Sequence, residues 1–250
     1  MRALRMLLVL LLAGPAVPAT ADLVTDLSES KVKVSYRYEG KTLLVFGNLP
    51  EAGGHVLLEV RGPERSRTLQ RKGKVAGLWM NVESMEIQGV PGYYALLSDV
   101  PLDELMPAGQ RQRLGIGREA LFRHARLEGK AAKATPEAYF EGLIDHMRDI
   151  GLYRMEPGSV QVRRGRLFRA ELRMPSRVPV GEYRIVTRQV KDGEVIHRDE
   201  RQLSVAKTGI EKWLYDMAHD HPAWYGLMAI AVALFAGWFV GMITRGEAEH

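Results

Sequence analysis

The chain has 250 residues, enough for one large or two small domains and a membrane anchor, and its formal net charge at pH 7 is +5. Hydrophobic residues make up 46% and charged residues 26% of the sequence, ordinary fractions for a globular protein that exclude wholesale disorder. There is no cysteine, which excludes disulfide exchange, thiolate catalysis and covalent haem attachment.

The first 21 residues have the pattern of a secretory signal peptide. Arg2 and Arg5 form a basic start, residues 6–13 form a short apolar segment, and an A-x-A cleavage pattern ends at Ala21. The apolar segment is too short to span a bilayer comfortably. We therefore expect cleavage after Ala21 and export. With a signal peptide and a membrane anchor, the bacterial periplasm is the predicted compartment of the exported region.

Residues 22–110 are expected to form a β-sandwich module. Apolar and polar residues alternate around Val32, and strand-like segments then recur about every 8 to 12 residues between turns that contain glycine or proline. Tyr94 follows a Val-Pro turn near the start of the last segment. Immunoglobulin-like sandwiches place a tyrosine at such a position, where its hydroxyl fixes the preceding corner.

Residues 111–157 are predicted to be a helical insertion, with about one helix on either side of Gly129. Thr135 is expected to cap the second helix, with Pro136 at its first position. This helix would bury one apolar stripe and end near Gly151. The stripe consists of Tyr139, Phe140, Leu143, Ile144 and Met147.

Residues 158–207 are expected to form a second β module of about four strands. Asp192 and Gly193 fit a tight hairpin turn, and Tyr183 follows a Val-Pro turn as Tyr94 does. Four strands are few for a closed sandwich, so this module is expected to pack against the first module. The predicted fold class is mainly β: two immunoglobulin-like antiparallel β-sandwich modules with a helical insertion, a juxtamembrane amphipathic helix and one C-terminal transmembrane helix.

Residues 208–221 are predicted to form the juxtamembrane amphipathic helix. Apolar residues recur at helical spacing from Ile210 to Ala218, and charged and polar residues take the other face. Such a helix, with a tryptophan and a tyrosine, could lie in the membrane interface or dock under the second module.

The end of this helix carries a cluster of acidic residues and histidines: Asp216, His219, Asp220 and His221. Residues three and four apart share a helix face, so the first three side chains are expected to lie together. Imidazole and carboxylate ligands suit Zn²⁺ and other divalent metals, which makes the cluster a candidate metal site. Two alternatives remain open. In the first, the cluster caps the juxtamembrane helix and couples it to the transmembrane helix, because Pro222 disfavours helical geometry at the residue before it. In the second, the cluster relays protons or ions together with a partner protein.

Residues 222–243 are predicted to be a transmembrane helix, because they form an uncharged apolar run of the length that spanning a bilayer requires. Aromatic residues lie near both ends, and Arg245 is the first charge that follows. The alternative is a buried core helix. If the N-terminal region is exported, residues 244–250 form a cytoplasmic tail, and the protein crosses the inner membrane once.

Four small residues recur at four-residue intervals along this run: Ala229, Ala233, Gly237 and Gly241. Small residues at such spacing let two helix backbones approach closely in lipid, where packing drives association. We therefore expect this helix to pack against a partner helix, either of a polytopic inner-membrane protein or of a second copy of the chain. The sequence alone does not separate these two partners.

No familiar catalytic motif occurs in the sequence: it lacks a G-x-S-x-G elbow, a phosphate-binding loop, a dinucleotide-binding glycine pattern and H-E-x-x-H. We therefore predict neither an enzyme nor a cofactor. Residues 61–74, 111–130 and 163–169 are markedly basic. Such patches favour lipid headgroups, oxyanions or acidic proteins, although strand edges use the same residues to remain soluble. Nucleic acid is not an expected partner of an exported domain.

The signal peptide and four further sequence stretches resemble a family of uncharacterised alphaproteobacterial single-pass transmembrane proteins of about this length. The four stretches are RKGKVAGLWMN, VPGYYALLS, LFRAELRMPSRVPVGEYRI and YDMAHDHPAWYGLMA. The resemblance covers essentially the whole chain but carries no functional residues with it. What it implies is an accessory protein for a polytopic transporter similar to the sulfite and organosulfur exporters, because genes of such proteins often neighbour those permeases. This is an implication of association and not of a site.

The sequence thus predicts a periplasm-facing, membrane-anchored accessory or assembly subunit of a polytopic inner-membrane protein, and the resemblance implies that this protein is an anion exporter of the sulfite and organosulfur type. The alternative is a periplasmic metal-binding protein that uses the juxtamembrane Asp/His cluster. A third interpretation is a homodimeric envelope protein that uses the small residues on itself.

Overall fold

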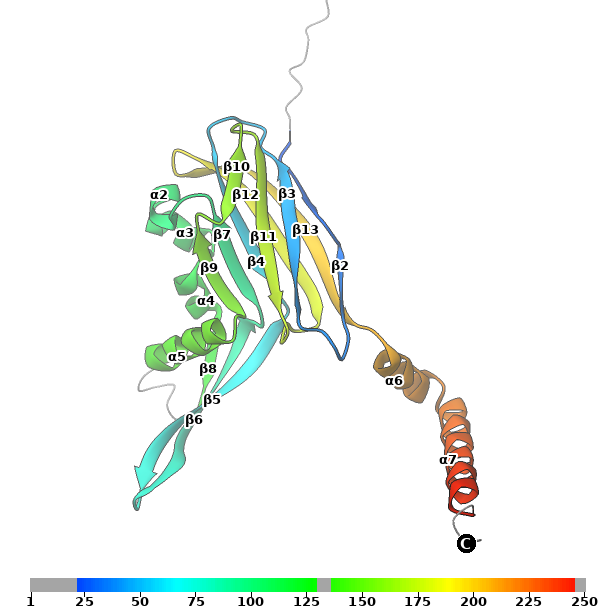
Figure 1. Ribbon diagram of the computed structural model, residues 1–250. Coiled ribbons are helices and arrows are strands. Elements are labelled where there is room, and N and C mark those ends of the chain that lie inside the picture. Colours follow the sequence, from blue (N-terminus) through cyan, green and yellow to red (C-terminus); the bar gives the residue numbers. More distant parts are fainter. Residues whose placement is uncertain (1–21, 130–135, 246–250) are drawn as a thin grey trace, which may run out of the picture.

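The computed structural model describes residues 22–129 and 136–245. The predicted signal peptide and Thr135 lie outside these described residues, as do the last five residues of the predicted tail. Within the described residues, the chain folds into a β-sandwich with a helical flank, a projecting hairpin and two C-terminal helices that extend away from the sandwich (Figure 1).

The first sheet of the sandwich has four antiparallel strands in the order β1-β3-β11-β10. Their bounds are Val24–Leu27 for β1, Gly40–Asn48 for β3, Leu167–Pro175 for β11 and Val160–Arg163 for β10. Exposed and buried residues alternate along β11. This is the pattern of a strand with one face on the core and the other in solvent.

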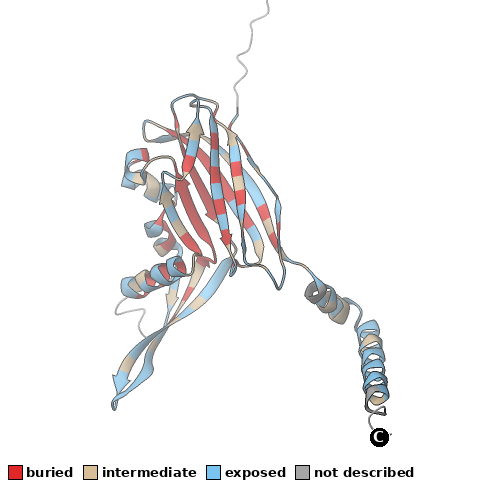
Figure 2. Cartoon of the chain, in the orientation of Figure 1, coloured by how far each residue is buried: buried red, intermediate tan, exposed pale blue. Residues whose placement is uncertain are grey.

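The second sheet has six strands in the order β2-β13-β12-β4-β7-β9. Their bounds are Lys31–Val34 for β2, Glu194–Lys207 for β13, Gly181–Lys191 for β12, His55–Arg61 for β4, Tyr94–Ser98 for β7 and Tyr153–Pro157 for β9. The two outermost pairs, β2 with β13 and β9 with β7, are parallel. Continuous burial along the middle of β4 and β12 shows that both faces of this sheet are covered at its centre (Figure 2).

The strands expected to form two modules interleave in one sandwich. β3 pairs with β11 from Gly40–Pro175 to Asn48–Leu167, and β4 pairs with β12. Buried side chains from both segments belong to a single hydrophobic core. The mainly β class is confirmed, and the division into modules at 22–110 and 158–207 is corrected. Each segment supplies strands to both sheets, so neither can bury its apolar faces without the other.

The predicted helical insertion is present as a flank of short helices followed by a longer one. The bounds are Leu102–Leu105 for α2, Ala108–Arg113 for α3, Arg118–His124 for α4 and Pro136–Asp149 for α5. All five residues of the predicted apolar stripe of α5 are buried, which confirms the helical period there. The insertion also holds two strands that were not expected, β8 (Arg126–Glu128) and β9, because each is completed by a distant partner strand.

Buried tyrosines fix the corners of the sandwich. The Tyr183 hydroxyl donates to the carbonyl of Pro179 at 2.6 Å, the local corner contact that the sequence predicted. Tyr94 does not make such a contact: its hydroxyl donates to Glu59 at 3.2 Å. Its neighbour Tyr93 instead donates to the carbonyl of Arg173 at 2.9 Å and so ties the two sheets together.

A long hairpin projects from the sandwich (Figure 1). Its strands are β5 (Glu64–Val75) and β6 (Leu78–Pro91), and the short β8 pairs with the base of β6. Ala76 and Gly77 form the two-residue turn, with φ of 50° and 86°. Positive φ at both positions gives the turn type that matches the twist of a hairpin. The outer half of the hairpin is exposed (Figure 2).

Two helices complete the chain after β13. α6 spans Ile210–Asp220, and α7 spans Pro222–Arg245. α7 includes a 21-residue segment, Pro222–Met242, that is long and apolar enough to cross a membrane, and none of its most apolar part is buried against the described chain. This excludes the alternative of a buried core helix within the described structure.

Candidate functional site

The apolar surface of α7 is the first candidate site. Ala229, Ala233, Gly237 and Gly241 lie along one side of the helix, and each step of four residues turns the stripe by about 40° around the axis. The stripe is therefore about 18 Å long and follows a ridge along which helices cross at close range. A Cβ atom added at Gly237 would meet nothing within 4 Å, so this point of the helix surface is open to a neighbour.

His221, the last residue of the Asp/His cluster, forms the junction between α6 and α7. His221 has φ of −137° and leaves the helical conformation, and its N–H donates to the carbonyl of Met217 at 3.1 Å. The carbonyl of His221 in turn accepts from the N–H of Tyr225 at 3.0 Å. One residue thus closes α6 and opens α7, with Pro222 at the first position of the second helix. This is the capping arrangement that the sequence suggested for the cluster.

The structure does not bring the four cluster residues together as a metal centre. His219 Nδ1 lies 2.9 Å from the carbonyl oxygen of Tyr215, and its ring stacks on the Tyr215 ring with a centroid separation of 4.0 Å. Among the described residues, no three His, Asp or Glu side chains form a group that could hold a metal ion. Metal binding by Asp216, His219, Asp220 and His221 therefore stays a prediction without geometric support.

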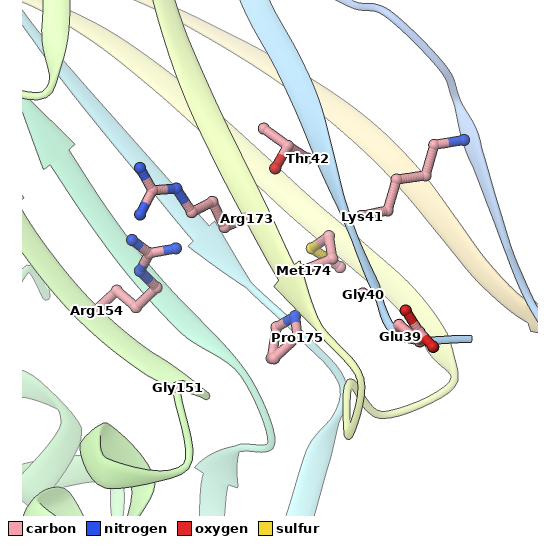
Figure 3. A pocket seen from close by; sticks show the side chains of 9 residues that line it. All are labelled: Glu39, Gly40, Lys41, Thr42, Gly151, Arg154, Arg173, Met174 and Pro175. Atoms are coloured by element: carbon pink, nitrogen blue, oxygen red, sulfur yellow. The ribbon is translucent and has the colours of Figure 1, made fainter. Parts of the chain in front are cut away.

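An open hollow of about 410 Å³ on the side of the sandwich is lined by three basic residues, by the acidic Glu39 and by five neutral residues. Arg154 of β9 and Arg173 of β11 extend into it from different sheets, and Lys41 of β3 lies near its other end (Figure 3). Arg154 is paired with Glu156, and Lys41 with Glu29 at 2.5 Å. Among the described residues no ion pair involves Arg173, so its guanidinium is the positive charge of this hollow that is suited to contact a small anion.

Glu59 is the most deeply buried carboxylate among the described residues, and its contacts favour a structural role. Its oxygens accept from Arg188 at 2.9 Å, from Arg61 at 2.8 Å and from the hydroxyl of Tyr94 at 3.2 Å. The Tyr94 hydroxyl also accepts from the N–H of Gly117 at 3.0 Å, which holds the segment before α4 on the sheet. With these partners on both oxygens, Glu59 is engaged within the fold.

The comparison with known families fits this picture of an exposed domain and a single apolar helix. The chain matches, over residues 22–246, the model of a family described as "Putative transmembrane protein (Alph_Pro_TM)". The chain belongs to this family. The match covers the sandwich, the hairpin, α6 and α7, and it begins at the residue after the predicted cleavage position. No curated protein and no solved structure matches the chain.

Family membership confirms the resemblance found in the sequence, and together with α7 it supports membrane association through a single helix. The arginine pair at the basic hollow was not predicted. Arg154 and Arg173 lie outside the three basic segments of the sequence, and they line the same hollow although β9 and β11 belong to different sheets. A single arginine in a predicted strand does not indicate which distant residue will line the same hollow.

Proposed function

We propose that this protein is a periplasm-facing, membrane-anchored accessory subunit of a polytopic inner-membrane protein. The observation that carries the proposal is the exposed side of α7. A membrane helix whose small residues form a continuous stripe, and whose most apolar part has no buried residue in the described structure, is suited to pack on another helix.

The orientation in the membrane follows from the two ends of the chain. A cleaved signal peptide would leave the sandwich on the periplasmic side, and Arg245 after α7 fits the cytoplasmic side by the excess of basic residues found there. The capped junction at His221 supports the same proposal, because it restricts the geometry between α6 and α7. A subunit held in this way would present its sandwich to the outer side of its partner.

The partner class that we propose is an exporter of sulfite-type or organosulfur anions. The resemblance of the sequence to proteins associated with such exporters supports it, and so does the open basic hollow that contains Arg154 and Arg173. A basic surface beside the exit of a transporter would raise the local concentration of anions.

Affinity purification of the full-length protein from its native membrane in a mild detergent, followed by mass spectrometry, tests the proposal. Gly237→Leu fills the stripe and is expected to release the polytopic partner. Ala231→Leu adds the same side chain on the opposite side of α7 and is expected to retain it. Equal recovery of partners by both variants, or recovery of this chain alone by the unsubstituted protein, contradicts the accessory function.

A further inference from the structure

The tip of the β5–β6 hairpin exposes a group of large apolar side chains. We define the hairpin tip as residues 71–83. Leu78 and Trp79 are 69% and 68% exposed, and Val75, Met80 and Val82 are exposed as well. Large apolar side chains gathered at the end of a projection indicate a surface that meets another apolar phase, because isolated soluble domains avoid such patches.

The charges beside this apolar group are mainly positive. Arg71, Lys72 and Lys74 lie on β5, and Glu83 is the one acidic residue of the hairpin tip. Glu83 is paired with Arg71 at 3.0 Å, while the ammonium of Lys74 lies 5.7 Å from the centre of the Trp79 ring. Tryptophan, aliphatic side chains and nearby lysines together are typical of protein segments that sit at the level of lipid headgroups.

The hairpin and the membrane anchor leave the same end of the second sheet. β4 ends at Arg61, which pairs with Arg184 near the start of β12, and the hairpin begins three residues later at Glu64. At the same end of β12, Gly181 pairs with Val205, just before β13 leads into α6. In Figure 1 the hairpin and α7 accordingly extend from the same end of the sandwich.

The hairpin is also long enough to reach the membrane that α7 crosses. Twelve residues of β5 span about 40 Å. On the anchor side, α6 lies between the sandwich and α7 and has 11 residues, so its length is about 16 Å. The hairpin therefore extends further from the sheet than α6 does, and its tip can meet the bilayer surface beside α7.

We infer that the hairpin tip inserts into the headgroup region of the membrane leaflet nearest the sandwich. Its apolar side chains enter the boundary between headgroups and acyl chains, and its lysines contact anionic headgroups. The protein then has two membrane contacts, α7 and the tip, which fix the orientation of the sandwich over the bilayer. This inference rests on the anchor and the hairpin alone and does not require a polytopic partner.

The test is a depth measurement on the full-length protein, purified and reconstituted in nanodiscs of phosphatidylethanolamine and phosphatidylglycerol without any other protein. Because the sequence has no cysteine, one introduced cysteine gives a single spin-labelling site. Leu78→Cys and Met80→Cys report on the tip. Ser66→Cys reports on the exposed base of the hairpin, and Glu194→Cys on the opposite end of the sandwich.

Labels at Leu78→Cys and Met80→Cys are expected to be more accessible to oxygen, which partitions into lipid, than to a water-soluble nickel chelate. Both control labels are expected to show the reverse. Lys72→Glu combined with Lys74→Glu should reduce the depth of the tip labels. Tip labels as accessible to the nickel chelate as the Ser66→Cys label overturn the inference. A tip that is exposed in nanodiscs but crosslinks to a protein in native membranes also overturns it, in favour of a protein partner.

Discussion

Arg188 and Glu59 form a buried ion pair that joins two parts of the chain 129 residues apart. The distance from Nη1 to Oε2 is 2.9 Å, and the two side chains are 9% and 3% exposed. Arg188 lies on β12 and Glu59 on β4, adjacent strands at the centre of the second sheet. The contact therefore lies where the two predicted modules merge into one sandwich.

Replacing Arg188 by methionine is expected to destabilise the whole sandwich. The change leaves a buried carboxylate without one of its two guanidinium partners, and breaking a buried pair in this way costs about 3–5 kcal/mol. Chemical denaturation of the full-length protein in detergent, followed by circular dichroism of the strands, should show one transition at lower denaturant. Two separate transitions of the β signal would contradict the single sandwich.

Four buried tyrosines, Tyr93, Tyr94, Tyr153 and Tyr183, are expected to resist ionisation until the protein unfolds. Burial raises the pKa of each hydroxyl well above its ordinary value of 10.0. Since the folded-state pKa is the higher one, their contribution to stability is complete below pH 10 and is lost as the pH rises toward the folded pKa. The part of the absorbance change at 295 nm that comes from these four tyrosines should appear above pH 10 only together with unfolding; ionisation of all nine tyrosines in the folded protein would contradict this burial.

The purified protein is expected to hold no stoichiometric metal at the Asp/His cluster. His219 contacts Tyr215, and His221 forms the helix junction, so the four side chains do not converge. Metal analysis of the full-length protein and of His219→Ala should give equal, sub-stoichiometric values. One bound zinc per chain that disappears in His219→Ala would support the alternative function of metal binding.

Replacing Arg173 by glutamine should separate transport from assembly. The change removes a positive charge from the basic hollow, and loss of local attraction is expected to lower anion export by about two- to tenfold at low salt. Arg166→Gln, at the turn before β11, serves as the matched control. Export assays should show the difference while affinity purification recovers the partner equally. Unchanged anion export by Arg173→Gln would contradict the proposal that the hollow attracts the exported anion.

The sequence was most informative where structure is local. The apolar stripe of α5, the hairpin turn at Asp192 and Gly193 and the apolar run of α7 were predicted correctly, because each depends on residues close together in the chain. The corner contact of Tyr183 is local in the same way, since its acceptor is four residues upstream.

Long-range pairing was not predictable from the same patterns. Alternating apolar residues identify a strand but do not identify its neighbour, so the pairing of β3 with β11 and of β4 with β12 remained hidden. The hydrogen bond from Tyr93 to the carbonyl of Arg173 could not be predicted for the same reason, because the two residues are 80 positions apart in the chain. The segment 61–74 was read as a basic surface, but only the structure shows that it forms half of a projecting hairpin with an apolar tip.

Photo-crosslinking from α7 in native membranes shows directly whether the small-residue stripe contacts a partner protein or lipid. A photoreactive amino acid at Ala233, on the small-residue side, is expected to crosslink to a polytopic membrane protein that mass spectrometry then identifies. The same amino acid at Ala231, on the opposite side, is expected to react with lipid alone. Crosslinks to lipid from both positions, or crosslinks from Ala233 only to a second copy of this chain, would contradict the accessory-subunit account.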